Sequence, residues 1–318
     1  MDQEGKTEQL ADIAEREARK QQTKDQVRGV GINLAELESY PQLIERLTEL
    51  DNGPRSHFKD SLEIVKIINL LWEEFGLAGV SLEQMKWAAI LHDIGKTGPI
   101  QATTPEQRQL VIKLFGPKNV PNASDQPLES LVNKVFPEQK QRGQSLDSLK
   151  KMGLKLNPDS ATQNHDLQDG TVLNFWRLHD DWTYDILEKT RNNYPAGPLD
   201  QTITQIAASH HLLENKNPAH LPSDNDSKLD ERTANILKAS RVLAMVDQYQ
   251  ALRRRSGLNH NKLEGEKKSG AIESLTDKIN DHQQQLSTEA FDDYQRVIKI
   301  LAEAEAGLEE ILQPRAAE

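Results

Sequence analysis

The stretch SLEQMKWAAILHDIGK, residues 81–96, decides the fold of this chain. Ser81 and Gln84 have the spacing of a capping box, which predicts a helix beginning directly after Ser81. The five apolar residues Trp87–Leu91 follow within that helix. Gly95 lies where the helix is expected to stop. The stretch therefore predicts a capped helix with an apolar second half.

Helical periodicity also dominates on both sides of this stretch. No run of alternating β-branched residues bounded by turns occurs, so we expect an all-α fold. A further start signal is Thr104-Pro105-Glu106, which puts proline in the first turn and an acidic residue near the helix dipole. The other predicted helices span residues 34–50, 54–75, 172–192, 199–213, 230–252, 271–285 and 287–312.

Residues 116–171 have the composition of an insertion, being rich in Pro, Gly, Asn, Asp and Ser. Apolar patches at 128–135 and 146–154 predict two small helices within it. A lid over a site and a loose surface loop explain the insert equally well. The predicted order is an N-terminal helical arm over 1–50, a main domain over 51–312 that contains the insert, and a tail over 313–318.

Composition limits the possible functions. The 318 residues include 39 Lys and Arg against 50 Asp and Glu, a net charge of -11, which argues against a protein that grips nucleic-acid backbone. There is no cysteine, so any metal must be held by nitrogen and oxygen. No apolar run approaches the roughly 20 residues that span a membrane, and the start, MDQEGKTEQL, lacks a signal-peptide core. We expect a cytoplasmic protein.

Three of the nine histidines lie in adjacent polar pairs, His92-Asp93 and His210-His211, and each pair ends an apolar helical run. Buried imidazole and carboxylate groups need hydrogen bonds or a metal. A His-Asp pair alone is also explained by a histidine oriented by its neighbour. The His-His pair is evenly balanced between a metal site and another role. Lys96 returns to the face of Asp93 if the helix persists that far.

Asp247 closes the apolar run Val242–Val246. An ionised carboxylate in such a helix needs a cation. A salt bridge or a hydrogen bond at the helix end would satisfy it as well as a metal would.

The order of these groups is more specific than any one of them. The chain reads, in order, RSHFKDSLEIV (His57), AAILHDIGK (His92, Asp93, Lys96), FWRLHDDWTYDIL (His179), IAASHHL (His210, His211) and ASRVLAMVDQYQAL (Asp247). This order resembles the HD superfamily of metal-dependent phosphohydrolases, and within it the HD-GYP branch associated with cyclic dinucleotides. The resemblance covers about residues 53–301 and implies an HD-type helical bundle with flanking N- and C-terminal helices.

The resemblance implies a site with two divalent transition metal ions, with iron or manganese favoured. One ion would be held by His57, His92, Asp93 and Asp247. Asp93 would bridge to a second ion held by His179, His210 and His211. Lys96 would contact the substrate and neutralise charge on its phosphoryl oxygens, which makes Asp93 and Lys96 the catalytic residues.

The implied reaction is hydrolysis of a phosphodiester by a hydroxide shared between the two metals. The substrate would be a cyclic dinucleotide or a related nucleotide in signalling, and neither a membrane nor extended nucleic acid is expected as a partner. The alternatives are a nucleotide phosphomonoesterase and a catalytically silent HD-type binding module with a regulatory role.

The chain departs from the branch in three places. Gly53 stands where three-metal members carry glutamate, so we expect two metals. The sequence LLENKNPAHLPSD follows His210-His211 where the branch has its Gly-Tyr-Pro loop. The long connection between Lys96 and His179 holds the insert.

Other polar and aromatic residues have plainer explanations. The basic run Arg253–Arg255 is expected to be a solvated helix end, with a nucleotide phosphate as the alternative. The aromatic residues near His179 are expected in the core, with base stacking as the alternative; they are Phe175, Trp176, Trp182 and Tyr184. Ordinary surface positions are expected for His165, His220, His260 and His282.

Overall fold

The computed structural model describes residues 3–52, 56–117, 120–158, 169–214, 216–222, 229–258 and 270–312. Every regular element in these ranges is a helix, and no strand occurs among them, which confirms the all-α prediction. The chain divides into two compact units, and each is assembled from segments far apart in the sequence. Unit 1 comprises Met1–Phe58 and Asp93–Pro198, and unit 2 comprises Lys59–His92 and Leu199–Glu318.

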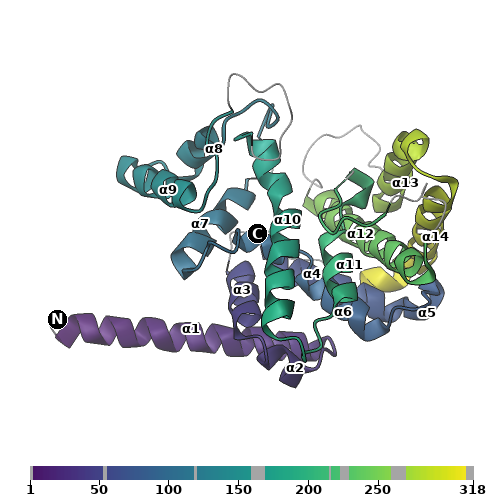
Figure 1. The fold of residues 1–318 in the computed structure, drawn as a ribbon, viewed down its shortest axis with the longest axis horizontal. Helices are drawn as coiled ribbons and strands as arrows, with labels where there is room; N and C mark the ends of the chain where they lie inside the picture. Colours follow the sequence, from purple (N-terminus) through teal and green to yellow (C-terminus); the bar gives the residue numbers. More distant parts are fainter. Residues whose placement is uncertain are drawn as a thin grey trace. The chain divides into compact units, whose positions relative to one another are not determined.

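Unit 1 is built around the short 3₁₀-helix η1, which lies against α3, α7 and α10. The helix α1 packs against α2 and α3, while α8 and α9 pack together and against α7 (Figure 1). Its elements are α1 (Gln3–Gly29), α2 (Leu34–Glu38), α3 (Pro41–Asp51), η1 (Ile94–Thr97), α7 (Pro105–Phe115), α8 (Leu128–Val135), α9 (Gln139–Lys151) and α10 (Val172–Asn193).

The helix predicted over 34–50 is divided in the structure into α2 and α3. The break lies at Tyr40, whose φ of -123° and ψ of 70° are outside the α region. The residue before a proline is pushed out of that region, and Pro41 is itself the first residue of α3. The sequence prediction of one continuous helix was wrong because it ignored this proline.

The insert is folded where the structure describes it. α8 matches the predicted helix over 128–135, whereas α9 begins and ends earlier than the predicted 146–154. Leu128, Leu131 and Val132 of α8 are buried, as is Leu149 of α9. These buried side chains disagree with a loose surface loop, and the described part of the insert is a packed pair of helices.

Unit 2 is organised around α12, which lies against α6, α11, α13 and α14 (Figure 1). Its apolar run Val242–Val246 is buried, as is the run Trp87–Leu91 of α6. The elements are α4 (His57–Leu70, whose first two residues belong to unit 1), α5 (Trp72–Phe75), α6 (Leu82–Leu91), α11 (Gln201–Ala208), η2 (Leu212–Glu214), α12 (Glu231–Leu258), α13 (Ala271–His282), η4 (Gln283–Gln285) and α14 (Thr288–Ile311).

Local signals explain where α6 begins, but its end differs from the prediction. Ser81 and Gln84 form the predicted capping box, with hydrogen bonds in both directions. The α-helix ends at Leu91, not at Gly95, and residues 94–97 continue as the 3₁₀-helix η1. Gly95 does not end the helix; it lies in η1, where it packs closely against α10. No helix in the described part of the chain is long and apolar enough to cross a membrane.

Candidate metal site

Unit 1 contains a buried cluster of two histidines and two aspartates, His57, Asp93, His179 and Asp180, which we call the unit 1 cluster. Each of these residues is at most 7% exposed. Asp93 lies at its centre: the Oδ2 atom is 3.5 Å from His57 Nδ1, and the Oδ1 atom is 3.8 Å from His179 Nε2. One carboxylate thus faces a different imidazole with each of its oxygens, which is the arrangement that a bridging ligand needs.

The close packing of η1 on α10 brings Asp93 near His179. A Cβ atom added at Gly95 would lie 1.9 Å from the carbonyl oxygen of His179 and 2.7 Å from the Thr183 nitrogen and Oγ1 atom. The Gly95 amide donates a hydrogen bond of 3.0 Å to that hydroxyl. Gly95 is required because a side chain would separate the turn from the helix, and no left-handed φ is involved.

Lys96 reaches the unit 1 cluster as predicted, although through a different helix type. Its ammonium donates to Asp93 Oδ2 over 2.6 Å and lies 3.4 Å from His57 Nδ1. Side chains three residues apart eclipse each other in a 3₁₀-helix, so η1 places Lys96 directly over Asp93. The ammonium is thus a cation in direct contact with this carboxylate.

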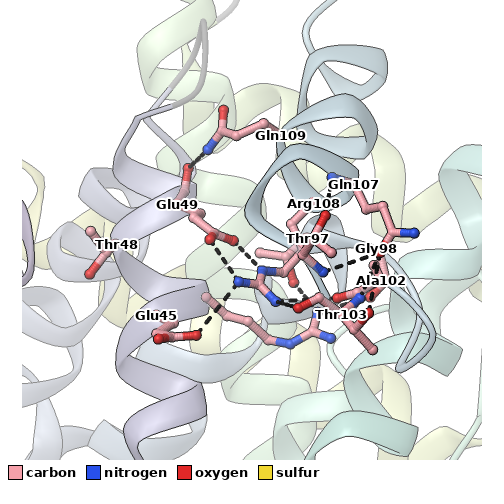
Figure 2. A network of polar contacts seen from close by, with 12 residues as sticks. Glu45, Thr48, Glu49, Thr97, Gly98, Ala102, Thr103, Gln107, Arg108 and Gln109 are labelled. Atoms are coloured by element: carbon pink, nitrogen blue, oxygen red, sulfur yellow. Dashed lines mark hydrogen bonds and ion pairs between the residues drawn. The ribbon is translucent and has the colours of Figure 1, made fainter. Parts of the chain in front are cut away.

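The turn after Lys96 is held by a network of buried charges between α3 and α7 (Figure 2). Arg46 donates to the Thr97 hydroxyl and to the carbonyls of Gly98 and Pro99, the latter two over 3.1 and 3.2 Å. Burial, and secondarily the charge of Arg108, lower the pKa of Arg46 to about 10. This network was not predicted from the sequence, because charged residues on helices are usually solvated.

Arg108 is bound by Glu49 through both carboxylate oxygens and also donates to the carbonyl of Thr103 over 3.0 Å (Figure 2). Burial raises the pKa of Glu49, although the hydrogen bond and charge of Arg108 oppose the rise. Such fork-to-fork pairs fix geometry as well as charge. The network therefore gives the turn that follows the unit 1 cluster a rigid support.

Unit 2 contains a second group of possible ligands, His92, His210, His211 and Asp247, which we call the unit 2 cluster. His92 and His210 are at most 1% exposed, and their rings meet edge to face with centroids 4.8 Å apart. The rings of His210 and His211 are 4.3 Å apart. Asp247 Oδ1 lies 3.5 Å from His92 Nε2. The salt bridge considered as an alternative for Asp247 is thus to a histidine of the same cluster.

Three of the histidines share one hydrogen-bonding pattern. The Nδ1 atoms of His92, His179 and His210 contact the main-chain oxygens of the residues three positions earlier, over 2.8, 2.6 and 2.7 Å respectively. A carbonyl oxygen only accepts, so each Nδ1 carries the proton. In the neutral ring the Nε2 atom then holds the lone pair, which is the atom that binds a metal.

Carboxylate oxygens lie beside two of these Nε2 atoms. The carboxylate of Asp247 lies beside the Nε2 atom of His92. The Oδ1 atom of Asp180 is 3.1 Å from the Nε2 atom of His179. A lone pair and a carboxylate repel each other unless a cation lies between them, either a proton on the ring or a metal ion. Donor atoms of His92 and His210, and of His210 and His211, also lie within 4.8 Å of each other. Both clusters are thus of the kind that can hold a metal ion.

Asp180 and Glu214 were missed by the sequence analysis. His179-Asp180 repeats the His-Asp dipeptide of residues 92 and 93, and that repetition was the available signal for Asp180. Glu214, three residues after His211, lies 3.2 Å from its Nδ1 atom. The other side-chain contacts of Glu214 come from distant segments, and no sequence spacing indicates them.

The plainer expectation for the aromatic residues agrees with the structure for Phe175 and Trp182, whereas the solvated helix end expected at Arg253–Arg255 is wrong for Arg253 and Arg254. Phe175 and Trp182 are buried with ring centroids 5.8 Å apart, and Trp176 donates to the carbonyl of Leu114. Arg253 and Arg254 are paired inside unit 2 with Glu63 and Asp60, so they form neither a solvated helix end nor an open phosphate site. Tyr184 is half-buried, His220 is exposed and His282 is half-buried; Gly53, His165, His260, residues 313–318 and the side chain of Arg255 lie outside the part described.

Comparison of the chain with protein families, with curated proteins and with solved structures found no match.

Proposed function

We propose that this chain is a binuclear metal-dependent phosphohydrolase that cleaves a phosphodiester, with a cyclic dinucleotide or a related nucleotide as its substrate. Its two divalent ions, iron or manganese, would be held by seven residues: His57, His92, Asp93, His179, His210, His211 and Asp247. The proposal extends the sequence resemblance to the HD superfamily, and the geometry within each cluster supports it.

The observation that carries the proposal is the pairing of imidazole Nε2 atoms with carboxylate oxygens. His92 and His179 have their protons fixed on Nδ1, and each turns its Nε2 atom toward an aspartate. Nitrogen and oxygen donors without sulfur suit iron, manganese or zinc. His92 of the unit 2 cluster and Asp93 of the unit 1 cluster are consecutive residues in the sequence.

Two divalent ions would supply a nucleophilic hydroxide at neutral pH and would screen the charge that develops on phosphoryl oxygens. The role of the chain is to orient the donors. Asp93 directs one oxygen to His57 and the other to His179. Lys96, whose ammonium contacts Asp93, would neutralise charge on a phosphoryl oxygen of the substrate beside the metals.

The direct test is elemental analysis of protein purified without chelators, together with hydrolysis of bis-p-nitrophenyl phosphate in Mn²⁺ by the same sample. We expect about two transition metals per chain and measurable hydrolysis. Metal without hydrolysis would favour the regulatory binding module, and release of inorganic phosphate from a nucleotide would favour the phosphomonoesterase. Neither metal nor hydrolysis after reconstitution with Mn²⁺ or Fe²⁺ would contradict the proposal.

Asp93→Asn is the sharpest variant because it keeps the shape of the side chain and removes its charge. We expect loss of both metal and hydrolysis, since this carboxylate is proposed to bind both ions. Asp147→Asn, at an exposed position of α9, is the matched control and should leave both unchanged. Full activity of Asp93→Asn with two metals bound would show that Asp93 is not a bridging ligand.

A further inference from the structure

The hydrogen bond of His211 differs from those of the other histidines in the two clusters. The Nδ1 atoms of His92 and His210 face main-chain carbonyls at the ends of α6 and α11. The Nδ1 atom of His211 instead lies 3.2 Å from the Oε2 atom of Glu214. An ionised carboxylate only accepts, so the Nδ1 atom of His211 carries a proton, and in the neutral ring the lone pair then lies on Nε2.

Glu214 is itself held from two other helices of unit 2. Lys278 of α13 donates to its Oε1 atom, and Gln248 of α12 donates to the same atom over 3.2 Å. The short helix η2 adds a hydrogen bond of 3.0 Å from the Glu214 amide to the His211 carbonyl. The carboxylate is thus fixed by donors on one oxygen while the other faces the imidazole.

The ionised state of Glu214 agrees with this geometry. The ammonium of Lys278 contacts the Oε1 atom of this carboxylate and stabilises its negative charge. A carboxylate behind an imidazole makes the ring a stronger metal ligand than a carbonyl does, and it also fixes the orientation of the ring.

We infer that Glu214 is a positioning residue for metal binding, which fixes the tautomer and direction of His211, and that Lys278 and Gln248 hold Glu214 in place. This inference rests on the proposed role of His211 as a metal ligand. It assigns a function to the segment after His210-His211. Through Lys278, it also connects α13 with the strength of His211 as a metal ligand.

The test compares the full-length wild-type protein with Glu214→Ala, Glu214→Gln and Lys278→Met, each stripped of metal. Calorimetric titration with Mn²⁺ alone at pH 8 should show affinity weakened about 10- to 100-fold in Glu214→Ala. Glu214→Gln should lose less, because its amide oxygen still accepts from Nδ1, and Lys278→Met should lie between the two. Glu303→Gln, an exposed carboxylate on α14 paired with Lys299, is the matched control and should bind like wild type.

A second readout needs no metal. Nitrogen-15 spectra of the histidine rings, with the His211 signals identified through His211→Gln, should show the proton on Nδ1 in wild type and on Nε2 or exchanging in Glu214→Ala. An unchanged tautomer together with unchanged Mn²⁺ affinity in Glu214→Ala would overturn the inference and leave the proposed function intact. Wild-type protein that binds no Mn²⁺ or Fe²⁺ would instead remove the proposed function, and this inference with it.

Discussion

A methyl group at Gly95 would collide with the backbone of α10, and this residue therefore provides a test of how η1 is placed. The nearest atom, the His179 carbonyl oxygen, belongs to the main chain and cannot rotate away. We expect Gly95→Ala to destabilise the protein by about 3 kcal/mol or more, at the upper end of overpacking effects. Urea unfolding followed by circular dichroism measures the change.

Gly143 offers the matched control, because it lies within α9 and a Cβ atom there meets nothing within 4 Å. Gly143→Ala should stabilise the protein by about 0.5 to 1 kcal/mol, since alanine restricts the unfolded chain. Equal stability of the two variants would mean that η1 does not pack on α10 as described.

The buried phenol of Tyr249 makes the free energy of unfolding depend on pH. Its side chain is fully buried, and its hydroxyl has no hydrogen-bond partner among the residues described. Burial, with the charge of Glu305 as the next cause, raises its pKa to about 12. The unfolded chain loses this proton near pH 10, so the stability contributed by the protonated phenol is complete below pH 10 and is lost as the pH rises toward 12.

The expected result is a stability difference between wild type and Tyr249→Phe that depends on pH. At pH 8 the variant should be at least as stable as wild type, because no hydrogen bond is lost. At pH 11 wild type should have lost about 1 kcal/mol more than the variant. Urea unfolding at both pH values measures this, and a difference independent of pH would contradict the raised pKa.

At the scale of elements, the contacts between α3, α7 and η1 depend on charge balance. Glu49 is the buried anion bound directly to Arg108, with Arg46 close by, and all three side chains belong to residues at most 8% exposed. We expect Glu49→Gln to cost about 3 kcal/mol, because two guanidinium groups then lose a buried counter-charge. Glu45→Gln is the control: its side chain is 35% exposed and 3.6 Å from Arg108, so the loss should stay below about 1 kcal/mol. Urea unfolding of the two single variants and the wild type measures both losses of stability.

The elements also show which features the sequence could predict. Helix starts at Ser81 and Thr104 are local events that involve residues within one turn, and both were predicted, the first from its capping box and the second from its proline and acidic residue. The break at Tyr40 was equally local and was overlooked. The partners of Arg46 and Glu214 lie on other helices, so side-chain packing decides them and no spacing along the chain indicates them.

The order of candidate ligands was visible in the sequence, while their hydrogen bonds were not. Asp93 and His210 were named from their positions at the ends of apolar helical runs, and His179 from the order of motifs that resembles the HD superfamily. The protons on Nδ1 of His92, His179, His210 and His211 follow only from the carbonyl or carboxylate oxygens that the fold places beside these rings. The same holds for Asp180. The dipeptide His179-Asp180 is visible in the sequence, but the direction of the Asp180 side chain is set by α10.

For the molecule as a whole, metal should stabilise the folded chain if the clusters bind it. An ion present at about 100 times its Kd adds about 2.7 kcal/mol. For a chain of this size the melting temperature should then rise by about 5 °C. Differential scanning fluorimetry of the stripped protein with and without Mn²⁺ measures the rise, which Asp93→Asn should abolish and excess chelator should reverse. A rise of the same size in Asp93→Asn would place the binding elsewhere.

The interleaving of the two units has a consequence for synthesis on the ribosome. Asp93 is synthesised long before His179 of α10, which it contacts in unit 1. Likewise, α6 is synthesised before α11 and α12, the helices against which it packs in unit 2. Neither unit can be completed by the first half of the nascent chain. The apolar stretch Trp87–Leu91 is therefore exposed throughout most of translation, and a chaperone that shields it would matter more to this protein than to one whose domains follow each other along the chain.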